Sequence, residues 1–314
     1  MNETQKLSSE YIDFLAQDCD RTSFIVNYLE KRGVKSTVIN IDERRHIYVN
    51  FPKEQYSGYF RIKTLIAHYD RVKESPGAND NSFAVFTMMN WAVALNEKNI
   101  QHNIRLIFTD GEEMDALQGQ GAFSLAGTFR RLGITNDDVY VFDCMGRGTI
   151  PVLQKPPILD KAKPEFKKKF NALFNKTQAI LQTAAGGSWV TLPVSWSDNA
   201  GFIASGIPAV LVTMLPEDEA SAYMMSLTKN PELEDFVVNH KAPTQSEREL
   251  FSSMIPETWK FLHSKKDSPE SITAESAYVF ERILNVIALF KGTSVTILRD
   301  ICRGADILRF RSSD

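Results

Sequence analysis

Continuous apolar runs that alternate with helical patterns constrain the fold of this chain more than any other feature. Residues 63–69, 103–109, 138–144 and 207–215 carry apolar side chains on both faces of an extended strand. Apolar residues at helical spacing separate several of these runs, most clearly in residues 82–97. Strands without a polar face are typical of parallel sheets that helices cover on both sides. We therefore predict an α/β fold, a three-layer αβα arrangement around a mostly parallel, mixed central sheet.

Other segments extend this predicted architecture. Residues 36–41 and 46–51 are short β-rich runs that precede the first buried strand. Residues 8–32 have helical spacing and end at Gly33, which favours an N-terminal helical region. Residues 270–291 predict a long amphipathic helix that closes the fold.

The length of 314 residues is compatible with one large α/β domain, and we predict a single domain over residues 1–314. Residues 151–185 and 216–256 are longer than ordinary connections and contain Lys-, Pro- and Ser-rich stretches. We interpret both as insertions or lids on that domain. The tail at 292–314 has no assigned role.

Composition argues against several classes of function. With 36 basic and 39 acidic residues the net charge is −3. The chain lacks an excess of basic residues, so its composition does not indicate nucleic-acid binding. The sequence contains no run of about 18 apolar residues, so we expect no membrane span. The N-terminus lacks the pattern of a signal peptide, which favours a cytoplasmic location. Cys19, Cys144 and Cys302 are odd in number and far apart, so we expect free thiols.

Acidic residues and one histidine stand where three predicted strands end. The carboxyl ends of parallel strands meet at one edge of a sheet, where α/β proteins bind ligands. We therefore expect these side chains to converge, and the turn SPGANDN adds Asp80 to them. The residues are His68 and Asp70 after the first strand, Asp110, Glu112 and Glu113 after the second, and Asp143 after the third.

So many carboxylates in one place repel one another, so either their pKa values rise or a cation neutralises them. A pair of divalent metals suits this arrangement, and mixed His and carboxylate ligands favour zinc, with cobalt or manganese also compatible. Each residue alone has an ordinary explanation, such as a turn, a helix cap or a solvated first turn, and for Asp110 a turn or helix cap is favoured. Their joint occurrence at three strand ends favours a metal site.

Over roughly residues 10 to 290 the chain resembles the zinc-dependent aminopeptidases of peptidase family M28, which also includes the related glutaminyl cyclases. The combination of segments is specific, although each is weak alone. The matching segments are AHYD (67–70), PGANDN (76–81), RLIFTDGEE (105–113), VFDCMG (141–146), SDNAGF (197–202) and GIPAV (206–210).

The resemblance implies a zinc exopeptidase-like fold and two zinc ions with named ligands. His68 and Asp143 would bind one zinc, Glu113 would bind the other, and Asp80 would bridge both. Glu112 would be the general base that takes a proton from the metal-bound water and passes it to the leaving amine. Asp70 and Glu112 are thus the expected catalytic pair, because Asp70 would orient the imidazole of His68 by a hydrogen bond.

The resemblance also requires a second histidine ligand from a loop before the last helix. His263 is favoured, because the residues after it, including Asp267, match the family's local pattern with serine in place of threonine. His240 is the alternative. His46 and His102 lie in or before early strands, far from the required position.

The chain departs from the family pattern at Asn199, where the family often has histidine after Ser-Asp. This change is expected to alter substrate contacts or transition-state stabilisation. Several apolar residues between 211 and 262 either line a specificity pocket or pack in the core, and core packing is favoured. They are Met214, Tyr223, Met224, Met225 and Trp259.

The leading hypothesis is a two-zinc aminopeptidase that acts on peptides with a free N-terminus. A glutaminyl cyclase with one zinc is an alternative, and so is a non-catalytic binding protein that retains the fold. A serine or cysteine hydrolase is not favoured. The chain has no G-x-S-x-G nucleophile motif, and we interpret Cys144 as a small residue at the end of a strand.

Overall fold

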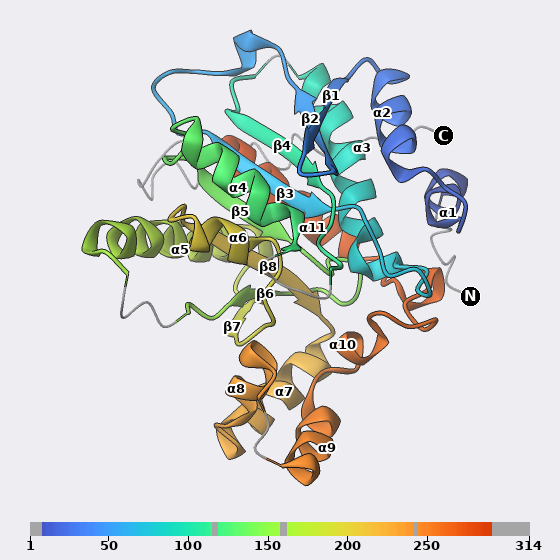
Figure 1. Ribbon diagram of the computed structural model, residues 1–314, viewed down its shortest axis with the longest axis vertical. Helices are drawn as coiled ribbons and strands as arrows, with labels where there is room; N and C mark the ends of the chain where they lie inside the picture. Colours follow the sequence, from blue (N-terminus) through green and yellow to red (C-terminus); the bar gives the residue numbers. More distant parts are fainter. Residues whose placement is uncertain (1–7, 99, 115–118, 158–161, 242–243, 291–314) are drawn as a thin grey trace.

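An eight-stranded mixed sheet forms the centre of the protein (Figure 1). The computed structural model describes residues 8–98, 100–114, 119–157, 162–241 and 244–290. The strands are β1 (Lys35–Ile41), β2 (Arg44–Asn50), β3 (Lys63–His68), β4 (Ile104–Thr109), β5 (Asp138–Phe142), β6 (Ile150–Gln154), β7 (Val190–Leu192) and β8 (Ala209–Leu215). Their order in the sheet is β1-β2-β4-β3-β5-β8-β6-β7. The four central strands β4, β3, β5 and β8 are parallel, whereas β2 and β6 run antiparallel to their neighbours β4 and β8.

Helices cover both faces of this sheet, with α4 and α6 in front of the strands and α11 behind them in Figure 1. One layer contains α1 (Ser9–Leu15), α2 (Arg21–Glu30), α3 (Phe83–Glu97), α5 (Pro164–Ala185) and α11 (Ser276–Leu289). The other contains α4 (Gly121–Arg131) and α6 (Asn199–Ala204). The helices α7 (Glu217–Lys229), α8 (Leu233–Asn239), α9 (Gln245–Met254) and α10 (Glu257–Phe261) pack against the same hydrophobic cluster and lie below the sheet in Figure 1. Short turns are η1 (Lys53–Gln55), η2 (Ala78–Ser82) and η4 (Pro269–Ser271).

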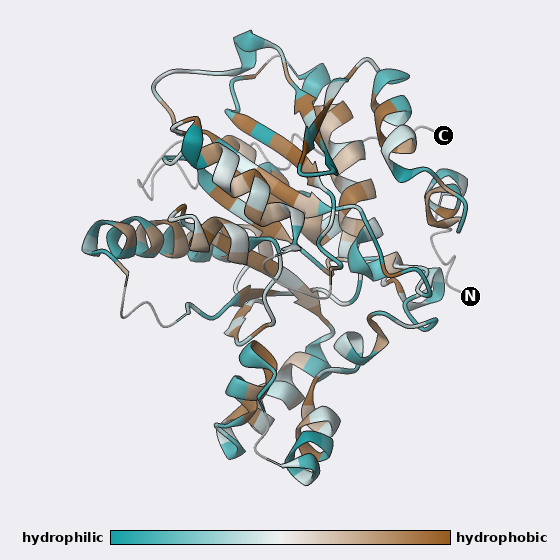
Figure 2. Ribbon diagram, in the orientation of Figure 1, coloured by the Kyte–Doolittle hydropathy of each residue, from teal (hydrophilic) through white to brown (hydrophobic). Residues whose placement is uncertain are grey.

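Consecutive residues of the central strands pack in two separate hydrophobic clusters, one on each face of the sheet. Leu65 packs in the cluster on one face of the sheet, and Ile66 packs in the cluster on the other. Leu106 and Ile107 divide in the same way, because side chains alternate across a strand. The central strands are accordingly brown in Figure 2 between helices of mixed hydropathy. The predicted three-layer α/β fold is confirmed.

Two predicted helices have different bounds in the structure. The N-terminal region is two helices rather than one, because Asp20 caps α2 by accepting a hydrogen bond from the N–H of Ser23. The closing helix begins at Ser276 and not at residue 270, since η4 turns the chain before it.

The two stretches that we interpreted as insertions contain regular structure. Residues 151–185 include most of β6 and all of α5, whose Leu173, Ile180 and Leu181 pack in the main core. Residues 216–256 include α7, α8 and α9, which lie below the sheet in the view of Figure 1. The tail at 292–314 lies outside the described residues.

Cys19 and Cys144 are free thiols, and Cys302 lies in the part of the chain that the structure does not describe. None of the described helices combines the length and the apolar character needed to cross a membrane.

Glu281 on α11 provides a test of this packing, because burial raises its pKa to about 7. In the unfolded chain a glutamate titrates near pH 4.3, so the folded state disfavours the ionised form of Glu281. The free energy of unfolding of the protein therefore falls as pH rises from about 4.3 to about 7. Glu281→Gln should therefore increase the free energy of unfolding by up to about 3 kcal/mol at pH 8 and by little at pH 4.5. Urea unfolding at both pH values measures this. Exposed Glu54→Gln is the control, and an equal gain at both pH values would contradict the assignment.

Candidate metal centre

His68, the last residue of β3, lies at the centre of a carboxylate cluster at the carboxyl edge of the sheet. Its side chain is 1% exposed. Its Nε2 atom is 3.2 Å from Oδ1 of Asp80 and 3.5 Å from Oδ1 of Asp143. The ends of β3 and β5 and the turn after β3 thus supply one histidine nitrogen and two carboxylate oxygens at one point.

The second oxygen of Asp80 faces a different group of side chains. Oδ2 of Asp80 is 3.3 Å from Nε2 of His263, and that nitrogen is 2.9 Å from Oε2 of Glu113. His263 comes from the loop after α10 and its side chain is 57% exposed. One carboxylate therefore belongs to two groups of potential ligands at once.

The spacing of these atoms fits a divalent metal. Zinc lies about 2.0–2.1 Å from nitrogen and oxygen ligands, so two ligands of a tetrahedral ion are about 3.3–3.4 Å apart. The distances within the two groups run from 2.9 to 3.5 Å. Nε2 of His68 and Oδ1 of Asp143 are buried and make no hydrogen bond to the described residues. The donor atoms and their spacing therefore fit a divalent cation.

The electrostatics of the cluster indicate the same need for positive charge. Burial would lower the pKa of His68, but Asp143 and the other nearby carboxylates raise it well above its usual value. Hydrogen bonds to Asp80 and Glu113 raise the pKa of His263 to about 10. Burial raises the pKa of Glu112 well above its usual value. Without metal, protons on these groups balance the carboxylates; bound cations would replace them.

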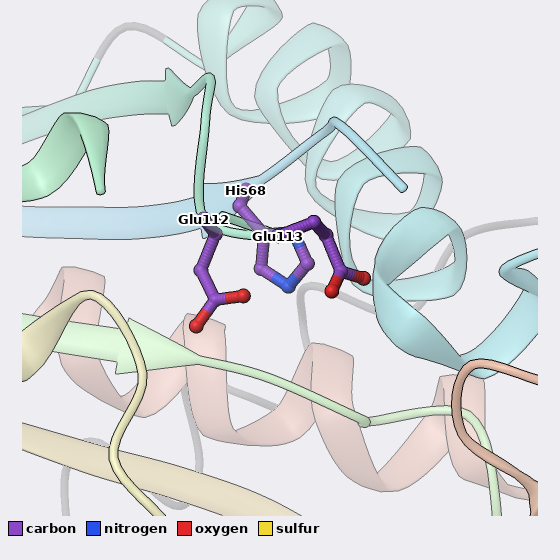
Figure 3. Close-up of side chains that lie close together, drawn as sticks. All are labelled: His68, Glu112 and Glu113. Atoms are coloured by element: carbon purple, nitrogen blue, oxygen red, sulfur yellow. The ribbon is translucent and has the colours of Figure 1, made fainter. Parts of the chain in front are cut away.

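Glu112 and Glu113 follow β4 and diverge around the imidazole of His68, one on each side in Figure 3. Asp70 fixes this pair, because its carboxylate accepts hydrogen bonds from the backbone N–H of Glu112 at 3.1 Å and of Glu113 at 3.0 Å. Oδ1 of Asp70 is also 3.6 Å from Nδ1 of His68, which is longer than a normal hydrogen bond. Asp70 thus positions the glutamates and lies beside the far nitrogen of the ring.

Gln120, the residue before α4, contacts Glu112 and was not predicted from the sequence. Its side-chain amide donates to the carbonyl oxygen of Glu112 at 2.7 Å and to Oε1 of the carboxylate at 3.1 Å. The two residues are eight positions apart in the sequence, and this spacing gives no sequence signal for such a contact.

The turn that carries Asp80 is held against the end of β5 by Asn81. The side-chain amide of Asn81 donates to the carbonyl of Phe142 at 2.8 Å and accepts from the N–H of Cys144 at 3.3 Å. These two residues flank Asp143, so the position of one ligand is tied to that of another.

Asp267 ties the Asp80 turn to the loop of His263. Its carboxylate accepts the backbone N–H of Asn79 at 2.6 Å and of Asp80 at 3.1 Å, and its carbonyl accepts the N–H of Ala78 at 3.1 Å. Asp267 is fully buried, and burial raises its pKa to about 6. The sequence pattern singled out Asp267 as part of a motif, but not these hydrogen bonds.

The N-terminal helices hold the same turn from another side. The buried guanidinium of Arg21 on α2 donates to the carbonyl of Tyr69 and to the hydroxyl of Ser82, both at 2.8 Å. The hydroxyl of Tyr11 on α1 donates to the carbonyl of Ala78 at 2.8 Å.

Two sequence candidates lie apart from the cluster. Asp110 has the ordinary turn role that was favoured for it, because its Oδ2 accepts the backbone N–H of Arg45 at 2.9 Å. The chain turns at Gly111, whose φ is +84°, and the following glutamates line the site. His240 is exposed at the end of α8, and no group of described residues able to hold a metal includes it. His46 and His102 are buried elsewhere.

The Ser-Asp-Asn segment lies behind the cluster. Asp198 accepts a hydrogen bond from the hydroxyl of Thr109 at the end of β4, and burial raises its pKa to about 7. Asn199 is fully buried and donates to Oε1 of Gln154 at 2.6 Å.

A cavity of about 540 Å³ opens beside the cluster, within the usual range of ligand sites. Asp80, Glu112, Glu113, Asp143 and His263 all line it. A ligand in this cavity therefore contacts the candidate metal ligands directly.

The sequence profile described as Peptidase family M28 matches residues 50–288. This chain belongs to peptidase family M28. The family membership agrees with the resemblance recognised in the sequence. No curated protein sequence matches the chain.

Solved structures of this M28 protein's fold include enzymes of two kinds. The LapA aminopeptidase of Legionella pneumophila has a TM-score of 0.58 and 14% identity, over 89% of this chain and 69% of that one. A leucine aminopeptidase precursor from Bacteroides thetaiotaomicron has a TM-score of 0.57 and 14% identity, over 91% and 97%. Tannerella forsythia glutaminyl cyclase has a TM-score of 0.56 and 16% identity, over 90% and 98%. Identities this low establish the shared fold alone.

Arg21 and Arg45 provide a matched test of the N-terminal contacts. Arg21→Met removes a buried donor to Tyr69 and Ser82, so the free energy of unfolding should fall by about 2–4 kcal/mol. The side chain of Arg45 is half exposed and forms an ion pair with Asp20 at 3.6 Å. Arg45→Met should therefore lower the free energy of unfolding by less than about 1 kcal/mol. Urea unfolding of both variants measures the difference, and equal losses would show that Arg21 does not support the turn.

Proposed function

We propose that this M28 protein is a two-zinc aminopeptidase that removes N-terminal residues from peptides. The observation that carries the proposal is the carboxylate of Asp80, whose two oxygens face separate groups of ligand atoms. His68 and Asp143 complete one group, and Glu113 and His263 complete the other. The family match and the aminopeptidases among the similar structures support the same conclusion.

Zinc fits this donor set, because mixed imidazole and carboxylate ligands suit it, although cobalt and manganese are also compatible. When bound, two such ions polarise the scissile carbonyl and make water nucleophilic at neutral pH. The residues of the chain then have to move the protons and hold the substrate.

Glu112 is the proposed general base. It lines the cavity beside the cluster. Glu112 forms a further group of possible metal ligands with His68 and Glu113, but neither group around Asp80 needs it. The side-chain amide of Gln120 donates a hydrogen bond to Oε1 of Glu112. Oε2 of Glu112 is then the oxygen that accepts a proton from the attacking water and returns it to the leaving amine. The raised pKa of Glu112 brings it closer to the neutral pH at which such a base works best.

The excess of carboxylates favours a substrate with a free α-amine. An ammonium group beside Glu112, the cavity carboxylate that neither ligand group around Asp80 needs, would be attracted by its negative charge. A peptide with a blocked N-terminus offers no such charge, which supports an exopeptidase over an endopeptidase.

A glutaminyl cyclase is the second candidate, because the Tannerella forsythia cyclase matches this chain over 98% of its own length. The ligand residues around Asp80 suit either activity, so these residues do not separate the two. Metal content, and the release of free amino acid rather than pyroglutamyl product from a glutaminyl peptide, distinguish the two.

Glu112→Gln tests the general base. The variant should retain its metal, because Glu112 completes neither ligand group around Asp80, and should lose about 10²–10⁴ of kcat on a leucyl arylamide. Metal analysis and initial rates measure both effects. Exposed Glu257→Gln on α10 is the control and should retain full activity. An active Glu112→Gln enzyme would refute the assignment.

His263→Ala and His240→Ala together test the last ligand. His263→Ala should reduce the zinc content from about two ions per chain to about one after dialysis, because only Asp80 and Glu113 remain in that group. His240→Ala should leave the content unchanged, since His240 is exposed and outside both groups. Elemental analysis gives the result, and zinc loss only in His240→Ala would reverse the choice.

A further inference from the structure

An ion pair beyond the candidate metal centre joins the end of β5 to the helices below the sheet. Arg147 lies shortly after the candidate ligand Asp143 in the sequence. Its Nη2 atom donates to Oε1 of Glu219 on α7 at 3.0 Å, and its Nε atom donates to the hydroxyl of Thr258 on α10 at 2.9 Å. The side chains of Arg147 and Glu219 are 20% and 12% exposed, so salt screens this pair less than an exposed one.

The backbone on both sides of Arg147 is anchored. The N–H before it, of Gly146, donates to Oδ1 of Asn79 at 2.7 Å, and the N–H after it, of Gly148, donates to the hydroxyl of Thr273 at 2.8 Å. Asn79 lies on η2, the turn that carries the shared carboxylate of the two ligand groups. The guanidinium therefore extends from a part of the chain that is fixed relative to that turn.

The helix α10 is short and depends on contacts from outside it. It has five residues, and its N-cap residue, Pro256, makes no side-chain hydrogen bond to the helix. Glu219 supplies such a bond, because its Oε2 accepts the backbone N–H of Thr258 at 2.8 Å. A helix of this length gains little stability from its own hydrogen bonds. Arg147 and Glu219 together therefore fix where α10 begins.

An aromatic contact holds α10 from a second side. Trp259 packs edge-to-face on Tyr223 of α7, with ring centroids 5.0 Å apart and an interplanar angle of 77°. Among the five apolar residues singled out in the sequence, core packing is confirmed for Met214 and Tyr223. It is wrong for Met224 and Met225, which are exposed, and Trp259 lines the cavity.

The end of α10 places His263. The guanidinium of Arg147 lies over the ring of Phe261, 4.7 Å from its centroid. The carbonyl of Phe261 accepts hydrogen bonds from the N–H of Ser264 at 3.2 Å and from its hydroxyl at 2.6 Å. His263 lies between these two residues with a φ of +59°, a left-handed conformation that a residue other than glycine keeps only where its surroundings hold it. Its side chain is more than half exposed, so contacts of its neighbours have to provide that support.

We propose that Arg147 is a positioning residue for one of the two metal ions, the one whose ligands include His263. The proposal rests on the proposed two-zinc centre. Arg147 belongs to neither ligand group and acts by holding α10, and with it His263, against the end of β5 and the turn η2. The group that includes His68 and Asp143 lies on strand ends and on η2, so its geometry does not depend on α10.

Arg147→Met tests this role through the metal itself. Stepwise removal of zinc from the loaded protein with a chromogenic chelator gives a dissociation constant for each ion. One ion should be held about 10-fold to 100-fold more weakly than in the wild type and the other should change by less than about 2-fold, because losing a residue that orients a ligand weakens binding by such a factor. A merely structural role would weaken both ions or neither, and either result would overturn the proposal.

Two further variants separate the position of α10 from the loss of charge. Arg147→Lys keeps the charge but lacks the planar fork that contacts Glu219 and Thr258 together, so it should weaken the same ion by less than Arg147→Met does. Lys155→Met removes another ion pair to these helices, with Glu234 at 2.6 Å. It should leave both ions unchanged, because Glu234 lies on α8 and not on α10. Equal weakening in Arg147→Met and Lys155→Met would contradict the proposal.

His263→Ala shows whether Arg147 acts through this histidine. In the His263→Ala background, adding Arg147→Met should change the affinity for the remaining ion by less than about 2-fold, because the ion that Arg147 supports is already lost. A further loss of about 10-fold in the double variant would show that Arg147 acts elsewhere.

These measurements need no peptidase activity, so the two proposals fail separately. If the wild type retains two zinc ions but releases no amino acid from any substrate, the aminopeptidase proposal fails, and the chelator data alone decide the role of Arg147. If the wild type retains one ion, the two-zinc proposal fails. Arg147 then keeps its role if Arg147→Met and His263→Ala weaken that ion alike, and loses it if they do not. If Arg147→Met does not fold, Glu219→Gln removes the charge of the pair and keeps its shape; it should weaken the same ion, and an unchanged affinity would overturn the proposal.

Discussion

The carboxylate of Asp80 is the group on which the rest of the site depends, because its two oxygens face both histidines. It lies on a short turn, η2, that leads directly into α3. Three other parts of the chain hold this turn: the end of β5 through Asn81, the loop before α11 through Asp267, and the N-terminal helices through Arg21 and Tyr11. The parts of the chain that surround the sheet therefore act on the site by fixing one side chain.

Like charges concentrated at one sheet edge oppose folding unless a cation balances them. Glu112 and Glu113 have pKa values raised first by burial, whereas the two histidines have raised pKa values because carboxylates surround them. The cluster can therefore be satisfied by protons or by metal ions. Because bound metal must displace those protons, metal affinity and folding stability are linked through pH.

The central strands and most of the cluster could be predicted because apolar runs end in polar residues and parallel strands share a carboxyl edge. Asp110 was favoured as a turn or cap residue, and the turn at Gly111 explains why it lies apart from the glutamates that follow. Gln120 and Asp267 act through contacts that depend on how separate loops meet, and no local pattern records them. The sequence therefore indicated where ligands gather but not what holds them.

The sheet and the small helices contribute different parts of the same cavity, and they meet at two adjacent residues. The strand ends provide His68 and Asp143, whose positions follow from the shared register of β3 and β5. Leu262 belongs to the apolar lining of the cavity, and the next residue, His263, contacts Asp80 and Glu113. His263 therefore reaches the centre from the residue that follows the apolar lining. The packing of Trp259 on Tyr223 holds α10, the helix that immediately precedes both residues.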